Sequence, residues 1–164
     1  MKKKVFLIIV VLFIGIQFIR PAKNLSSAVA VNGLANIYST PPEVSEILKK
    51  ACRDCHSNNT VYPWYAEVQP VAWWLNDHIN EGKKELNLDE FATYSIGRQY
   101  KKLEECIDQV KEGEMPLWSY TLIHTNAKLT DAEKQTFIDW CQTIRDTIKA
   151  KYPADSLVLK RRPE

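Results

Sequence analysis

The sequence predicts an all-α fold, because two segments carry clear helical patterns and no segment alternates as a strand does. Residues 95–114 begin at Ser95, a residue type that caps helices, and then place apolar residues at spacings of three and four. Residues 129–152 open with Thr130 and Glu133, the two positions of a capping box. The 164 residues suffice for one compact domain with one core.

Two further helices and two long loops complete the expected fold. Residues 41–56 predict a helix with proline near its start, and residues 71–86 predict another, with Trp74, His78 and Ile79 facing one side. Residues 87–95 predict a connector or short turn. Residues 57–70 and 115–128 lack periodicity and predict irregular loops, which usually carry function when they exceed ten residues.

The first 23 residues have the layout of a secretory signal or signal anchor. Three lysines precede an apolar run from Val5 to Ile19, and Arg20 and Lys23 follow it. This charge bias predicts a cytoplasmic amino terminus and export of the rest of the chain. The run is shorter than the roughly 20 residues of a typical span, and "AVA" at 28–30 offers a cleavage site. Retention in the inner membrane and release into the periplasm or medium both stay open.

Charge and composition separate this leader from the rest. Five of the 22 basic residues lie in the first 23 positions, which leaves 17 basic against 20 acidic residues. A mildly acidic body argues against a nucleic-acid surface. The expected organisation is a signal anchor or signal peptide at 1–23, a linker at 24–40, a helical domain at 41–152 and a tail at 153–164.

The segment "CRDCH" gathers Cys52, Cys55 and His56 into the attachment signature for c-type haem. Two thiols three residues apart lie on neighbouring positions of a helical turn, where they can reach the two vinyl groups of one porphyrin. The next residue then lies under the ring, so its imidazole can bind the iron. Thioether formation requires reduced thiols outside the cytoplasm, which agrees with the predicted export. The motif therefore predicts one covalent haem c.

Three other interpretations of the motif are weaker. A redox C-x-x-C would need a βαβ context and a helix N-terminus that lowers the thiol pKa. A zinc site would need a fourth ligand from a second C-x-x-C or H-x₃₋₅-H, which the sequence lacks. A disulfide across two intervening residues would be strained.

The second axial ligand of the iron is expected to be Met115. Apart from the initiator it is the one methionine, and it opens the loop "EGEMPLWSY". His/Met ligation raises the reduction potential relative to two histidines. His78 and His124 stay open as alternatives, as does a methionine that only fills the core.

The order of these parts resembles class I cytochromes c. More closely, residues from about 40 to 146 resemble a small bacterial family called the haem-binding domain, through C-x-x-C-H, an asparagine-rich turn before "YPWY", "WWLNDHI" and "EGEMP". The resemblance implies a cytochrome c-like fold of about four to five helices around one covalent haem. It implies attachment at Cys52 and Cys55, with His56 proximal and Met115 distal, and it implies no particular reaction.

Aromatic residues in and around the two loops are expected to wall the haem pocket, with Trp64, Trp74 and Trp118 as the main candidates. An ordinary aromatic core is the competing interpretation. By analogy with class I cytochromes c, the carbonyl of Pro63 is expected to accept the ring N–H of His56.

Cys106 and Cys141 are the remaining cysteines, and they either pair in an oxidising compartment or act as small buried residues. The leading functional hypothesis is a monomeric one-electron carrier that serves redox proteins of the cell envelope and is not an enzyme. A haem-based sensor or ligand-binding module is the first alternative, and a haem peroxidase is the weaker one.

Overall fold

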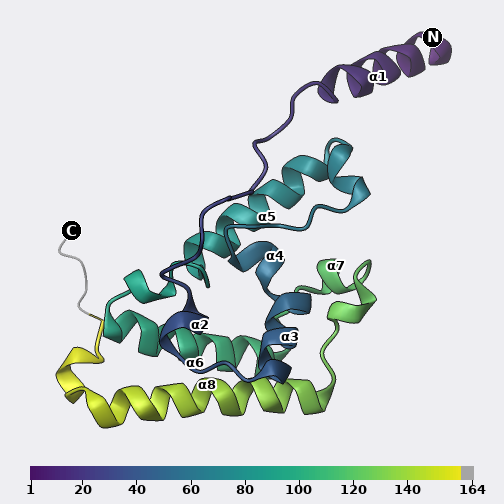
Figure 1. The fold of residues 1–164 in the computed structure, drawn as a ribbon. Helices are drawn as coiled ribbons and strands as arrows, with labels where there is room; N and C mark the ends of the chain where they lie inside the picture. The colour runs from purple at the N-terminus through teal and green to yellow at the C-terminus, as the bar shows by residue number, and fades with distance from the viewer. Residues whose placement is uncertain (160–164) are drawn as a thin grey trace.

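The computed structural model describes residues 1–159 as α-helices joined by irregular segments and single 3₁₀ turns (Figure 1). Within these residues there is no strand, which confirms the all-α prediction. The α-helices are α1 (Lys2–Ile16), α2 (Leu34–Ile37), α3 (Pro42–Ala51), α4 (Arg53–His56), α5 (Val71–Glu85), α6 (Ile96–Glu112), α7 (Trp118–Thr121) and α8 (Asp131–Lys151). The 3₁₀ turns are η1 (Trp64–Glu67), η2 (Phe91–Thr93), η3 (Thr125–Ala127) and η4 (Ala154–Ser156).

Helices α6 and α8 lie side by side and form the base of the body (Figure 1). Ser95 caps α6 by accepting the backbone N–H of Arg98, and Gly113, the residue after the last turn of α6, has a φ of 80° that suits glycine. Thr130 and Glu133 form both bonds of the predicted capping box at the start of α8. The two strongest helix predictions are therefore confirmed.

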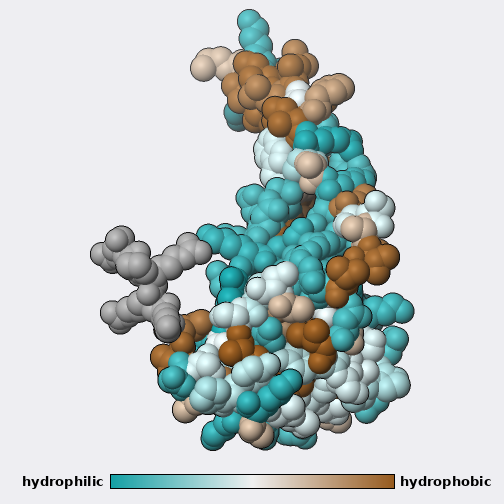
Figure 2. All heavy atoms as spheres, turned by 60° about the vertical axis from the view of Figure 1, so that its left-hand side comes forward, coloured by the Kyte–Doolittle hydropathy of each residue, from teal (hydrophilic) through white to brown (hydrophobic). Residues whose placement is uncertain are grey.

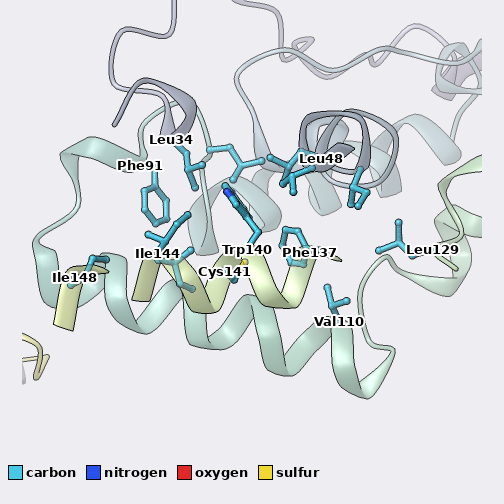
Figure 3. Close-up of a cluster of buried hydrophobic side chains, with 14 residues drawn as sticks. Leu34, Leu48, Phe91, Val110, Leu129, Phe137, Trp140, Cys141, Ile144 and Ile148 are labelled. Carbon is cyan, nitrogen blue, oxygen red and sulfur yellow. The ribbon is translucent and has the colours of Figure 1, made fainter. Parts of the chain in front are cut away.

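The main core lies between this helix pair and the segments above it (Figure 3). Helix α8 supplies the longest apolar row, and Trp140 also donates its indole N–H to the carbonyl of Ser39 at 3.0 Å. Leu34, Leu48 and Phe91 close the core from the other side. The row on α8 consists of Phe137, Trp140, Cys141, Ile144 and Ile148.

The helix predicted over residues 41–56 is broken at Cys52. Its backbone leaves helical geometry (φ −125°, ψ −44°), which ends α3 and turns the next four residues into the separate helix α4. The turn brings the carbonyl of His56 to the backbone N–H of Leu88 at 2.8 Å. The break therefore sets the direction of the C-x-x-C-H segment.

Residues 24–40, predicted as a linker, pack on the body. The side chain of Asn24 donates to the carbonyl of Ser57 and to the hydroxyl of Thr60, each at 2.9 Å. Leu34 is buried, and its N–H donates to the carbonyl of Leu88 at 2.8 Å. The sequence shows no periodicity here because most of these contacts are made by backbone and polar groups.

The buried side of α5 and the residues after α8 also differ from the prediction. The buried residues of α5 are Ala72, Leu75 and Ile79, whereas Trp74 is 44% exposed, so Trp74 and Ile79 do not share a face. Part of the predicted tail packs on α6, where the carbonyl of Ser156 approaches Gly97 so closely that an added Cβ would lie 2.8 Å away. Residues 160–164, including the Lys160-Arg161-Arg162 end of the tail, lie outside the described residues.

Helix α1 projects away from the other helices and carries no buried residue (Figure 1). Its apolar side chains form the large hydrophobic group at the top of Figure 2. Among residues 1–159, no helix has both the length and the apolar character needed to cross a membrane.

The capping box of α8 should be measurable in the stability of the fold. We expect Thr130→Ala to lower the free energy of unfolding by about 1 kcal/mol, because the backbone N–H of Glu133 loses its acceptor. Thr143→Ala is the matched control, since its exposed hydroxyl only donates to the carbonyl of Asp139 within the helix. Denaturant titration measures both, and equal losses for the two variants would contradict the capping role.

Candidate functional site

A cavity of about 300 Å³ lies between α3, α6 and α8. His56, Cys52 and Met115 all line it, although they come from α4, the break before α4 and the segment after α6. The fold thus brings three of the predicted site residues to one space. Most of the other side chains around it are apolar: Leu34, Ile47, Leu48, Ala51, Leu86, Leu88, Phe91, Leu103, Val110, Leu129, Phe137 and Trp140.

The ring of His56 is held in one orientation by two backbone carbonyls. Its Nδ1 lies 2.9 Å from the oxygen of Gly82 and 2.9 Å from the oxygen of Leu86. Carbonyl oxygens only accept hydrogen bonds, so Nδ1 must carry the proton. The other nitrogen, Nε2, therefore keeps its lone pair, which is the arrangement found in metal-binding histidines.

Burial lowers the pKa of His56, although the hydrogen bonds to Leu86 and Gly82 oppose this shift. Burial disfavours the charged imidazolium because it removes the ring from water. The neutral ring is the form that can bind a metal through nitrogen. The surroundings thus favour the protonation state that ligation requires.

Gly82 allows α5 to approach the C-x-x-C-H segment closely. A Cβ at this position would lie 2.8 Å from the carbonyl oxygen and 3.1 Å from the Cβ of Cys55. A contact below 3.0 Å with backbone forces the two segments apart. Because Gly82 has no side chain, its own carbonyl can come within hydrogen-bond distance of the His56 ring.

Charged and polar groups fix the turn around the motif. Asp89 is buried, pairs with Arg53 at 2.7 Å and accepts the backbone N–H of Asn58 at 2.8 Å. Asp54 accepts the hydroxyl of Tyr120 at 2.7 Å. Burial and the bond to Asp54 raise the pKa of Tyr120, which keeps its hydroxyl protonated as a donor. These contacts tie the motif to the segment after α5 and to α7.

The two motif cysteines face different surroundings. Cys52 lines the cavity, whereas Cys55 packs against the second apolar cluster of Ala66, Leu75 and Ile79. Burial raises the pKa of Cys52 to about 12 and that of Cys55 to about 11. Redox-active C-x-x-C pairs need a lowered thiol pKa, so these values argue against a thioredoxin-like role.

The histidines considered as alternatives to Met115 do not line the cavity. His78 directs Nδ1 at the carbonyl of Trp74 at 2.9 Å, and its ring lies against that indole. His124 places Nε2 2.6 Å from the hydroxyl of Tyr65 and stacks on another aromatic ring. Of the three predicted distal ligands, only the methionine shares the cavity with His56.

The residues predicted to wall the pocket lie elsewhere. Trp64 and Trp118 are 81% and 76% exposed, and neither they nor Trp74 line the cavity. The aromatic wall comes instead from Phe91, Phe137 and Trp140. Trp64 and Trp118 lie in the long segments between helices and Trp74 on an exposed side of α5, whereas the apolar row of α8 faces the core.

Pro63 does not contact His56 as predicted. Its carbonyl accepts the backbone N–H of Ala66 at 3.0 Å within the turn η1. The ring N–H of His56 is taken by Gly82 and Leu86 instead. Both acceptors lie at the end of α5, which the sequence pattern did not place beside the motif.

Three residues at the site were missed by sequence reasoning. Gly82 had a detectable signal, since an isolated glycine inside a helical pattern often marks a packing requirement. The carbonyl of Leu86 had none. Lys102 lines the cavity, is 13% exposed and pairs with Glu85 at 3.1 Å and Glu105 at 2.7 Å. It carries the one positively charged side chain among the cavity residues that the structure describes.

Cys106 and Cys141 are free thiols, and both line the cavity. Burial raises the pKa of Cys106 to about 12 and that of Cys141 well above its usual value. In this structure Cys141 is buried, Cys106 is half-buried, and the two do not form a disulfide.

The residues around the cavity fit a haem. A porphyrin is a large apolar plate that needs an apolar space, a neutral imidazole and, for covalent attachment, thiols beside it. The aliphatic and aromatic lining of the cavity provides the apolar space. His56 provides the imidazole, and Cys52 provides one thiol. Met115 adds a thioether of the kind that binds haem iron.

Comparison with known proteins agrees with this geometry. A family model described as a haem-binding domain matches residues 11–143, which is most of the chain. No curated protein and no solved structure matches the chain. The chain therefore belongs to the haem-binding domain family.

Proposed function

We propose that this protein is a c-type cytochrome that carries one covalent haem and transfers single electrons in the bacterial cell envelope. The observation that carries the proposal is the fixed ring of His56, a residue that lines an apolar cavity and whose Nε2 keeps its lone pair because Nδ1 carries the proton. Family membership supports haem binding in general. The C-x-x-C-H motif, the apolar cavity and the thioether of Met115 support a covalent haem with methionine as its second ligand.

Cys52 and Cys55 would attach the haem through their sulfurs. Each S–H adds across a vinyl C=C bond, so that sulfur bonds to one carbon and the hydrogen ends on the other. No oxidant is consumed. Cys52 already lines the cavity, while Cys55 must turn away from the cluster of Ala66, Leu75 and Ile79 to take part.

His56 and Met115 would be the axial ligands. A bound haem supplies an iron that alternates between ferric and ferrous forms. Two protein ligands leave no iron position for a substrate, which favours electron transfer over catalysis. The mostly apolar lining would favour a higher potential of a bound iron, and so would a methionine in place of a second histidine.

Helix α1 supports a location at the inner membrane, with the body in the periplasm. Its apolar side chains, from Val5 to Ile14, are almost all exposed, and a group of this size in water would promote aggregation. Insertion of α1 into the bilayer removes this surface from water. We propose that the anchored monomer exchanges electrons with redox proteins at the same membrane; where the leader is removed, the body is periplasmic or secreted.

Replacing Met115 with alanine should open the iron. We expect haem-loaded Met115→Ala to lose the weak long-wavelength absorption band of methionine-bound ferric haem and to bind carbon monoxide readily when reduced, because one axial position becomes vacant. His78→Ala and His124→Ala are matched controls and should keep the spectrum of the unaltered protein, since neither ring lines the cavity.

An unchanged six-coordinate spectrum in Met115→Ala would show that another residue is the ligand. Ready carbon monoxide binding by the unaltered protein would favour the gas-sensing or ligand-binding alternative over electron transfer.

Gly82→Ala should impair haem loading. The added Cβ would collide with the carbonyl of Cys55, so α5 must move away and withdraw an acceptor from His56. We expect a lower ratio of haem absorbance to protein than in Glu81→Ala, a change at the neighbouring exposed position of the same helix. Equal haem content in the two variants would contradict the role of this close approach.

A further inference from the structure

The residues that follow α1 are hydrogen-bonded to the body of the protein formed by the other helices. Helix α1 ends at Ile16, and the side chain of Gln17 already accepts the backbone N–H of Gln69 at 2.9 Å and donates to its carbonyl at 3.3 Å. The carbonyl of Ile19 accepts the side-chain amide of Gln69 at 2.8 Å and the indole N–H of Trp73 at 2.9 Å. These bonds fix where α1 leaves the body.

Charged residues extend this attachment. Arg20 and Lys23 both pair with Glu67, so one carboxylate holds two points of the chain that follows α1. All the partners named so far, Glu67, Gln69 and Trp73, belong to residues 64–74. This short segment, made of η1 and the start of α5, is therefore the part of the body nearest to the end of α1.

The same segment also exposes apolar side chains. Trp64, in η1, is 81% exposed, and Val68 follows at 37%. Val71 and Trp74 lie one turn apart on α5 and are 36% and 44% exposed. Tryptophan is enriched where proteins meet the headgroup region of a bilayer. We call these four residues the 64–74 face.

The length of α1 bears on where this face must lie. Its 15 residues span about 22 Å, which is less than the roughly 30 Å of a hydrocarbon core. A short inserted helix thins the bilayer or draws its flanking residues toward the surface. Because the attachment begins at Gln17, one residue after α1, the body has no slack that would let it stand away from the lipid.

We propose that the 64–74 face rests in the headgroup region of the membrane beside inserted α1. The proposal rests on the membrane anchoring proposed above and is independent of haem attachment. It sets the orientation of the body, because α6 and α8 lie at the end opposite α1 (Figure 1). The cavity, which these two helices border, then lies toward the end of the body that is away from the membrane (Figure 1).

Photo-crosslinking from lipid tests the contact directly. The full chain is placed in nanodiscs of phosphatidylethanolamine and phosphatidylglycerol that contain a lipid with a diazirine near its headgroup, and lipid adducts are mapped by mass spectrometry after illumination. We expect adducts on α1 and on residues 64–74 and none on α8. The variant Val68→Glu/Val71→Glu should lose most adducts on residues 64–74 and keep those on α1.

The variant Val158→Glu/Leu159→Glu is the matched control, because it adds the same two charges at exposed apolar residues that follow α8. It should leave the pattern of adducts unchanged. Adducts on α1 but none on residues 64–74 would overturn the proposed contact and leave the anchor standing. A chain that does not enter nanodiscs would overturn both the anchor and the contact, while the haem spectrum would still test the proposed function.

Discussion

The hydrogen bonds from the His56 ring to the carbonyls of Gly82 and Leu86 are the constraint on which the site depends. They decide which nitrogen is protonated and leave the lone pair of the other nitrogen available for a metal. Two acceptors from one helix end also limit rotation of the ring. Because the His56 side chain is already ordered, it loses little conformational entropy when it binds a metal, and the binding is correspondingly more favourable.

Several other features of the fold allow the His56 ring to contact the end of α5. The chain breaks at Cys52, so α4 can turn its histidine toward the end of α5. Gly82 removes the side chain that would keep α5 away. Buried Asp89 then fixes the following turn through Arg53 and Asn58. Helices α6 and α8 have a separate task, since their apolar rows supply the floor of the cavity and most of the core.

The sequence predicted what depends on local pattern and missed what depends on distant contacts. The caps at Ser95 and Thr130 and the motif residues could be found because each is defined within a few positions. The exposure of Trp64 and Trp118 could not, since a loop has no period that shows which side faces the core. The acceptors of His56 lie 26 and 30 residues away, so a nearby proline was a poor substitute for them.

The most direct test of the central claim is the mass of the protein purified from a host that matures c-type cytochromes, followed by peptide mapping. The account predicts a mass greater than that of the polypeptide by one haem, with the addition located on the peptide that contains Cys52 and Cys55. A colourless protein with the mass of its polypeptide and two reactive thiols in that peptide would contradict the account.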